Sequence, residues 1–399
     1  MISIRENRFV SFGADGAEDG LIGTGWGEPE GDFRWMLGNQ STLRFAELPI
    51  IKPIYLVLHV APLALESSLW PQRLSAFVNG TVVALPLVCE STLLIIRIDP
   101  YPKDDGNRSL VVLSHPDWVQ LMALFPYSTE SPDSRALSLR VREAVLLEIE
   151  GVKVEAQERA PKAFAPPDPA AQPFSALALK YFASIGDNCE FGLYQRRHGV
   201  EPPDLFRFSR LSVETLMIAL QDEFAELCEP SWISFGLRGD PAHREYVMIH
   251  EKYKFFSHTH VIEGSMPIAR MIGREIKKLF FLRRLILEDL RAASRIFVFK
   301  SNVPLSQHEI QDLSDSLQKY GDNVLLYVIQ APAGVVPGTV ERRGERILIG
   351  YLDEFLDYMR ADVPASDIWL SICEASYALW LAVRKSAQPV LARHIMETV

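Results

Sequence analysis

The stretch FASIGDNCEF, residues 182–191, decides the fold that we expect for the second half of the chain. A short apolar run over 179–185 predicts a strand, which ends at Gly186. The Gly-Asp-Asn turn then leads into residues 189–197, where Leu193 and Tyr194 predict a helix. Because ligands bind at the carboxyl ends of strands in an open parallel sheet, this turn is where we expect a site.

Beyond this turn, apolar strands alternate with helical stretches. A capping box, SQHE, opens one of the helices, and the expected strands and helices cover 267–290, 295–300, 306–320, 324–329, 346–351 and 367–384. Buried strands that are joined by helices pair in parallel. The fold class that we expect for 175–399 is therefore an α/β domain with a mainly parallel sheet.

The first third of the chain is rich in strand signals instead. Short β-type runs occur at 55–60, 73–78, 93–98 and 109–113, and Asn79-Gly80 is a typical hairpin turn. This spacing, without a long helical period, predicts a β-sandwich over 1–151. The stretch 152–174 contains five prolines and predicts a stiff linker between the two domains.

Composition excludes several classes of protein. The 399 residues carry a net charge of −10, with 48% hydrophobic residues, which predicts a globular chain and argues against a nucleic-acid partner. The N-terminus lacks the apolar core of a signal peptide, and the longest apolar run, 55–65, is too short to span a membrane. We expect a cytoplasmic protein without a transmembrane segment, and nothing in the sequence indicates its oligomeric state.

The four cysteines are widely spread and form no CxxC pair. Neither a zinc site nor a disulfide framework is indicated, and we expect no metal and no cofactor. Cys189 is the cysteine of interest because it falls in the first turn of the helix expected after the Gly-Asp-Asn turn. Free amides and the helix dipole at that position lower the pKa of a thiol, and amides near Asn188 and Cys189 would hold an oxyanion. The alternative is a buried thiol, with Asp187 or Asn188 capping the helix.

A nucleophilic cysteine needs a base, and His258 is the leading candidate. It lies in FFSHTH, residues 255–260, and a strand there would point His258 and His260 to one face. Asp187, Asp240 or Asn188 would orient the imidazole, and the sequence does not choose among them. A metal site and a plain polar strand face are the alternatives for this pair of histidines.

Four arginines are candidates for a binding site. Arg196 and Arg197 follow the cysteine, and Arg283 and Arg284 lie together in the long helix over 267–290. Such a group would bind a phosphate or a carboxylate. The alternative is a solvated helix face, with Glu288 and Asp289 as partners.

Several of these motifs together resemble a bacterial family described as papain-like cysteine peptidases. The carrying stretches are SIGDNC (184–189), QRRHG (195–199), DLFRFS (204–209), HTH (258–260), Arg283-Arg284 and IFVF (296–299). The family has Pro-Phe-Asp-Trp and His-Asp-Phe where this chain has DLFRFS and HTH, so both Asp residues are missing. The resemblance implies Cys189 as the nucleophile and His258 as its base.

The N-terminal third resembles a sandwich module found beside bacterial glycan-processing and glycosyltransferase domains. The carrying stretches are GWGEPE (25–30), FRW (33–35), VNG (78–80) and DSRAL (133–137). The resemblance implies surface-polysaccharide biology. Trp26 and Trp35 would offer flat faces to sugar rings, or else would fill the core of the sandwich.

These observations lead to an expected function with alternatives. The leading hypothesis is a cysteine-nucleophile hydrolase, or an acyl- or glycan-modifying enzyme, that acts on a glycan or peptide-like substrate. The second is a non-hydrolytic glycan-binding or glycosyltransferase-associated protein, in which Asp187, Asn188 and the arginines hold the ligand. The third is a structural module with Cys189 in its core.

Overall fold

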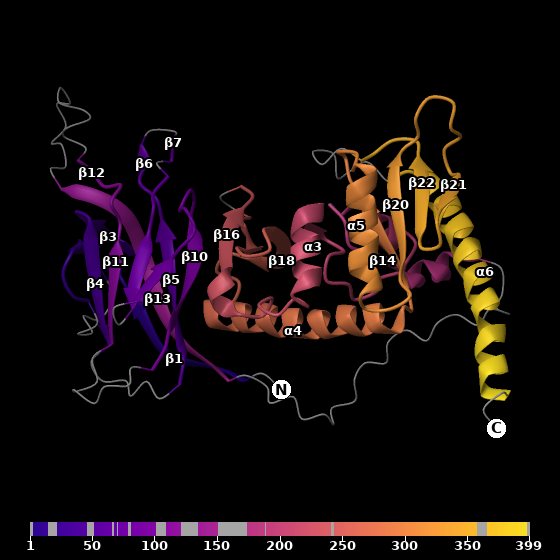
Figure 1. Ribbon diagram of the computed structural model, residues 1–399. Helices are drawn as coiled ribbons and strands as arrows, with labels where there is room; N and C mark the ends of the chain where they lie inside the picture. The colour runs from indigo at the N-terminus through magenta and orange to yellow at the C-terminus, as the bar shows by residue number, and fades with distance from the viewer. Residues whose placement is uncertain are drawn as a thin grey trace. The chain divides into compact units, whose positions relative to one another are not determined.

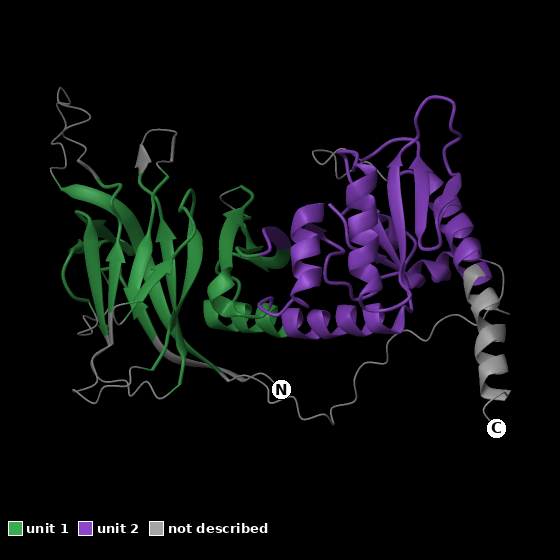
Figure 2. Cartoon of the chain, viewed as in Figure 1, with its two compact units in different colours: residues 1–155, 228–252, 258–277 green, residues 156–227, 253–257, 278–399 purple. Residues whose placement is uncertain are grey.

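The computed structural model divides the chain into two compact units, which are coloured separately in Figure 2. Unit 1 comprises Met1–Glu155, Cys228–Lys252 and His258–Lys277, and unit 2 comprises Ala156–Leu227, Tyr253–Ser257 and Lys278–Val399. The structure describes residues 3–14, 22–45, 52–65, 68–69, 71–78, 81–100, 109–120, 135–150, 174–187, 189–240, 243–356 and 365–396. The expected hairpin turn at Asn79-Gly80 and all but the last residue of the expected linker over 152–174 lie outside these residues.

Unit 1 contains the predicted β-sandwich (Figure 1). Its larger sheet includes β1 (Ser3–Ser11), β2 (Trp26–Glu30), β3 (Phe33–Leu37), β5 (Ile54–Ala61), β10 (Thr92–Ile98), β12 (Val119–Gln120) and β13 (Ala136–Glu150). The smaller sheet is formed by β4 (Gln40–Phe45), β8 (Ser75–Val78), β9 (Thr81–Ala84) and β11 (Ser109–Ser114), and β6 (Ala64–Leu65) pairs with β7 (Ser68–Leu69). Leu56 and Leu58 of β5 share one hydrophobic cluster with Val111 and Leu113 of β11, so the two sheets enclose a common core.

Both faces of β5 are buried, although only one of them faces the sandwich core. Side chains alternate along a strand, so Leu56, Leu58 and Val60 point into the core, whereas Val57 and His59 lie on the opposite face. That opposite face of β5 therefore carries a buried polar side chain, His59.

The larger sheet continues with β16 (Ile233–Arg238), β17 (Glu245–His250) and β18 (Phe255–Ile262), and β15 (Ser209–Arg210) pairs with the start of β18. β10 pairs with β16 and β16 with β17, both antiparallel. The prediction of a mainly parallel sheet over the whole of 175–399 is therefore wrong for this segment. For β16, β17 and β18 the physical reason is the short connections between them, because a short turn joins only antiparallel strands and a parallel pair needs a crossover.

The expected strands at 295–300, 324–329 and 346–351 occur as β19 (Ile296–Lys300), β20 (Val324–Gln330) and β22 (Ile347–Leu352). In the described part of unit 2 they form a five-stranded sheet with β14 (Phe182–Ser184) and β21 (Val340–Arg343), in the order β14-β19-β20-β22-β21. β14, β19, β20 and β22 pair in parallel, and β21 is antiparallel to β22.

The described helices are α2 (Glu190–Arg197), α3 (Val213–Gln221), α4 (Ile268–Ala292), α5 (Gln307–Gln318) and α6 (Ile368–Met396). Ser306 and Glu309 form the predicted capping box at the start of α5. Trp369, Ile372 and Trp380 of α6 belong to the same hydrophobic cluster as Val298 and Leu326 of the sheet. Among the described residues, none of the helices combines the length and apolar character needed to cross a bilayer.

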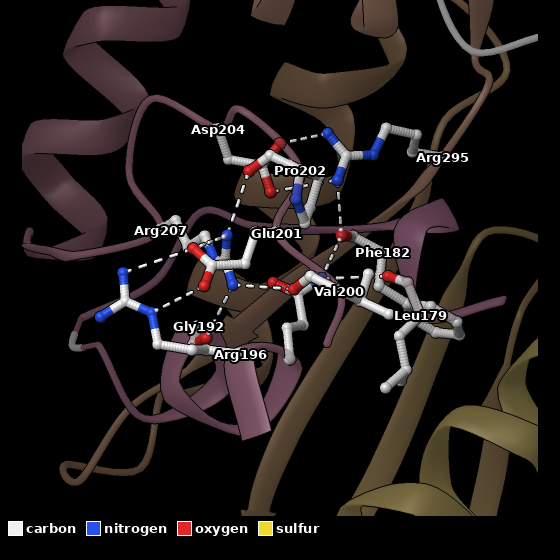
Figure 3. A network of polar contacts seen from close by, with 11 residues as sticks. Leu179, Phe182, Gly192, Arg196, Val200, Glu201, Pro202, Asp204, Arg207 and Arg295 are labelled. Carbon is white, nitrogen blue, oxygen red and sulfur yellow. Dashed lines mark hydrogen bonds and ion pairs between the residues drawn. The ribbon is translucent and has the colours of Figure 1, made fainter. Parts of the chain in front are cut away.

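A buried polar network holds the segment after α2 against the sheet (Figure 3). Arg295, at the start of β19, forms an ion pair with Asp204, another with Asp289 at 3.1 Å, and a hydrogen bond to the carbonyl of Phe182 at 2.7 Å. Arg207 donates to the carbonyls of Val200 at 2.8 Å and of Gly192 at 3.2 Å. Arg295 is only 1% exposed, so its charge depends on these partners for stabilisation.

The substitution Asp204→Ala leaves the Arg295 guanidinium buried with one carboxylate fewer. We expect it to lower the free energy of unfolding by about 3–5 kcal/mol, because an incompletely paired buried charge is costly. Urea unfolding of the full chain measures this. The matched control is Arg343→Gln, which breaks an ion pair with Glu341 in which both side chains are more than 40% exposed; it should change stability by less than about 1 kcal/mol. Equal, small effects of the two substitutions would contradict this role of the network.

Candidate functional site

The turn after β14 lies at the carboxyl edge of the parallel strands, as expected. A side chain at Gly186 would place its Cβ 2.7 Å from the backbone nitrogen of Lys300, so only glycine fits there. The Asp187 carboxylate accepts a hydrogen bond from the backbone amide of Asn302 at 3.0 Å, which joins the turn to the end of β19. Asn188 lies outside the described residues.

Cys189 is the N-cap residue of α2, and its side chain makes no capping hydrogen bond. Burial raises the pKa of its thiol, and the neighbouring Glu190 carboxylate raises it further, against smaller opposite effects that include the Lys300 ammonium. This direction is opposite to the lowering expected from the sequence. Burial acts in this direction because a thiolate that is removed from water loses its hydration.

Glu190 and Lys300 form a buried ion pair beside this thiol. Lys300 Nζ lies 3.0 Å from Glu190 Oε2, and each side chain is less than 5% exposed. The indole of Trp369 donates to Glu190 Oε1 at 3.0 Å, and the amide of Leu356 donates to Oε2 at 3.2 Å. These contacts connect α2, β19 and α6. The charges of Glu190 and Lys300 at this edge of the sheet therefore have partners within the fold.

His258 and His260 lie on β18, and both side chains are exposed. Their Nδ1 atoms lie 3.3 Å and 3.8 Å from Glu245 Oε1, and their rings stack at 6.1 Å. His258 belongs to unit 1 and Cys189 to unit 2, so neither unit holds the expected pair of nucleophile and base. Within the described ranges, no cluster of three His, Cys, Asp or Glu side chains forms a metal site.

The arginines expected to bind an anion have partners within the chain. Arg196 pairs with Glu201 at 3.1 Å, Arg197 pairs with Asp367 at 3.0 Å, and Arg284 lies 3.8 Å from Glu288. Arg283 donates to the carbonyls of Phe224 at 2.7 Å and Glu223 at 3.0 Å, just after α3. The alternative in which Glu288 is the partner of Arg284 is thus the arrangement found.

The two tryptophans have structural contacts in unit 1. Trp35 is 7% exposed, packs with Leu63 and Leu137, and donates from its indole to Glu30 at 3.2 Å. Trp26 packs against the sandwich core and donates to the carbonyl of Thr42 at 2.9 Å. The ring of Trp35 is therefore part of the interior of unit 1.

A constellation that sequence reasoning missed lies on the outer face of the larger sheet of unit 1. His59 of β5 is 4% exposed, and its Nδ1 lies 3.2 Å from Glu143 Oε1 of β13. Its Nε2 lies 3.0 Å from the Oγ of Ser91, the residue before β10. A serine, a histidine and a carboxylate are thus connected in series through the two imidazole nitrogens, which is the arrangement of a catalytic triad.

The register of the sheet produces this series. Glu143 is the cross-strand partner of His59, and Leu93 of β10 is its partner on the other side. The pairing of β13 with β5 shifts between Val141 and Glu143, so that Arg142 is an extra residue, a β-bulge. Without the bulge, Arg142 would lie opposite His59 and Glu143 would move to the core face.

The series opens into a hollow of about 80 Å³, which His59 and Ser91 line together with Arg140, Arg142, Arg244 and the carboxylate of Asp32. A second hollow, of about 240 Å³, lies along the same sheet and is lined by His59, Arg142, Glu143 and Tyr246 among others. Ser91 is partly exposed, whereas His59 is buried. A small molecule in the first hollow would therefore meet the serine hydroxyl and several guanidinium groups.

The hydrogen bonds determine which imidazole nitrogen carries the proton. A carboxylate only accepts hydrogen bonds, so Nδ1 of the neutral His59 donates to Glu143. Nε2 is then unprotonated and accepts from the hydroxyl of Ser91. This tautomer is the one in which histidine serves as a general base for a serine.

The sequence gives only a weak signal for this site. His59 stands out as a polar residue within the apolar run IYLVLHVA, whereas Ser91 and Glu143 lie 32 and 84 residues away and form no motif with it. The bulge is weakly visible in the alternation of the sequence. The core-facing residues Leu139 and Val141 have odd numbers, whereas Ala144 and Leu146, which follow the bulge, have even numbers. Val145 and Leu147 are also apolar and hide this change of phase.

Neither a family model nor a curated protein matches the chain. Among solved structures, a carbohydrate-binding module of family 36 in complex with calcium and xylotriose is 9% identical, over 37% of this chain and 93% of that chain, with a TM-score of 0.18. A second such module, from a xylanase of the hindgut metagenome of Trinervitermes trinervoides, is 10% identical, over 38% and 100%, with a TM-score of 0.20. A family two carbohydrate esterase from Cellvibrio japonicus is 9% identical, over 96% and 98%, with a TM-score of 0.21.

These TM-scores are too low to carry an inference about fold or function. The resemblance to papain-like cysteine peptidases has no matching family model behind it and stays a sequence-based prediction.

The raised pKa of Cys189 predicts that its thiol reacts slowly with alkylating reagents. At neutral pH, iodoacetamide should alkylate Cys189 at least about threefold more slowly than the exposed Cys89, because only the thiolate reacts. The buried Cys228 and Cys373 should react only on unfolding. Mass spectrometry of a time course on the native full chain measures all four thiols in one sample. Alkylation of Cys189 ahead of Cys89 would restore it as a candidate nucleophile.

Proposed function

We propose that the chain is a serine hydrolase of acyl esters, with Ser91 as nucleophile, His59 as general base and Glu143 as the group that orients His59. The observation that carries this proposal is the continuous series from Ser91 Oγ through His59 Nε2 and Nδ1 to Glu143 Oε1, at 3.0 Å and 3.2 Å, beside a hollow. Both spacings are within hydrogen-bonding reach, as general-base catalysis requires.

In the first half of the reaction, Ser91 Oγ attacks the carbonyl carbon of the ester and its proton moves to His59 Nε2. The tetrahedral intermediate collapses, the bond to the alcohol oxygen breaks, and His59 returns the proton to the departing alcohol. The acyl group is then bound to Ser91 Oγ. A water molecule repeats the sequence, with its proton passing to His59 and then to Ser91 as the carboxylic acid is released.

The surroundings of Ser91 support charge stabilisation in these steps. Arg140, Arg142 and Arg244 line the hollow with it, and guanidinium groups stabilise negative charge that develops on a carbonyl oxygen. Glu143 stabilises the imidazolium that forms when His59 takes the proton.

This proposal retains an acyl-group hydrolase as the activity but replaces Cys189 and His258 by Ser91 and His59. The reason is that one unit holds all three groups of the serine series, whereas the cysteine and its expected base lie in different units. We further propose that a glycan carries the acyl group, because the sandwich in which the series lies is the part of the chain whose sequence resembles modules beside glycan-processing domains.

A fluorophosphonate probe tests the nucleophile without knowledge of the substrate. The probe should label native wild-type protein at Ser91, and Ser91→Ala should abolish the label and lower hydrolysis of 4-nitrophenyl acetate by at least about 100-fold. His59→Gln should have a similar effect because the base is lost.

Two control variants make this test specific. Ser114→Ala removes a hydroxyl from β11 in the other sheet of unit 1, and Cys189→Ala removes the thiol of unit 2. Both should retain labelling and hydrolysis. The proposal is overturned if the wild type stays unlabelled at Ser91, or if activity survives in Ser91→Ala and disappears in Cys189→Ala.

A further inference from the structure

Arg140 differs from the other arginines of the hollow in its partners. Its guanidinium carbon lies 5.3 Å from the ring centre of Phe33 and 5.9 Å from that of Trp35, so two aromatic rings fix its position. The Nε atom of Arg140 is buried, and this atom has no hydrogen-bond partner within the described part of the chain.

The neighbouring arginines are already paired with carboxylates. Arg142 contacts Asp32 at 2.8 Å and Glu263 at 3.1 Å, and Arg244 contacts Glu263 at 2.6 Å. Three guanidinium groups thus share two carboxylates among the residues that the structure describes. Among the described residues, Arg140 is the one of these three arginines without a direct ion pair.

The energetics of Arg140 point in the same direction. Burial lowers the pKa of its guanidinium, the charge of Arg142 lowers it further, and Asp32 opposes both effects. The charged form is therefore held in an unfavourable environment. An anion bound in the hollow would offset this cost and would supply the missing hydrogen-bond acceptors.

We propose that Arg140 binds an anionic group of the substrate, so that the esters hydrolysed at Ser91 are acidic ones. The inference rests on the proposed function for the reaction, whereas the anion site itself follows from the geometry around Arg140. Because Arg140 lines the same hollow of about 80 Å³ as Ser91, the charge and the ester group are close together in the substrate. A carboxylate and a phosphate share the planar, bidentate recognition that a guanidinium provides.

The test uses acetoxyacetate, 3-acetoxypropanoate and 4-acetoxybutanoate, each compared with its neutral carboxamide. For at least one chain length, the wild-type kcat/KM should be about 10- to 100-fold higher for the carboxylate than for the amide, as expected for one charge-assisted hydrogen-bonding group. The preferred chain length would report the spacing between Ser91 and the anion site. The corresponding phosphate ester of acetylated ethylene glycol shows whether phosphate is preferred over carboxylate.

Arg140→Gln should bring the ratio between acid and amide close to one, and Arg140→Lys should retain part of the preference. Arg73→Gln is the matched control, since Arg73 is exposed and paired with Asp117 outside the hollow; it should leave the ratio unchanged. Circular dichroism establishes that each variant is folded. A wild-type ratio near one, or a ratio that Arg140→Gln leaves intact, overturns the inference.

A binding measurement separates this inference from the proposed function. In the full-length Ser91→Ala protein, calorimetry should show tighter binding of the preferred acetoxy acid than of its amide, and Arg140→Gln should remove the difference. If the fluorophosphonate leaves Ser91 unlabelled but this binding difference is present, the hydrolase fails and the anion site stands. If Ser91 is labelled and hydrolyses esters without any charge preference, the hydrolase stands and the anion site fails.

Discussion

The β-bulge at Arg142 is the constraint on which the arrangement of polar groups in unit 1 depends. Side chains alternate along a strand, so a regular β13 would place Val141, Glu143 and Val145 on a single face. Val141 lies in the sandwich core, and without an extra residue Glu143 would follow it there. The bulge changes the phase of the strand, so that Glu143 lies opposite His59 and Ala144 faces the core. A buried carboxylate in the core would have cost several kcal/mol without a partner.

The same bulge explains why polar groups tolerate burial on the outer face. His59 is almost fully buried, and each of its ring nitrogens has a partner, Glu143 on one side and Ser91 on the other. A buried histidine with a purely structural role needs hydrogen-bond partners as well, so the presence of these partners alone does not indicate catalysis. What distinguishes this histidine is that one of its partners is a serine hydroxyl at the border of a hollow, where a substrate could replace the hydrogen bond.

Sequence reasoning predicted the elements that depend on local patterns. Short apolar runs and turn or cap residues predict the sandwich, the strands β19, β20 and β22, and the capping box at Ser306. Two features could not be predicted from local patterns. The antiparallel strands β16 to β18 follow one another through short loops, and although β16 alternates apolar and polar residues, β17 does not. The series of Ser91, His59 and Glu143 depends on a register that no local spacing encodes. The sequence also shows that Cys189 lies at a helix end but not how deeply its thiol is buried, and burial raises the pKa of that thiol.

The two units illustrate how charge pairing separates structural polar groups from functional ones. In unit 2, Lys300 and Arg295 are almost fully buried, and carboxylates, amides or carbonyls of the fold surround them. Such pairs contribute to a unique arrangement of elements, and a ligand would have to displace an internal partner to reach them. Arg140 in unit 1 is held by aromatic rings, which fix its position without neutralising its charge. A cation that the fold positions without a direct ion pair is accessible to an anion, and in the site that we propose the substrate supplies this counter-charge.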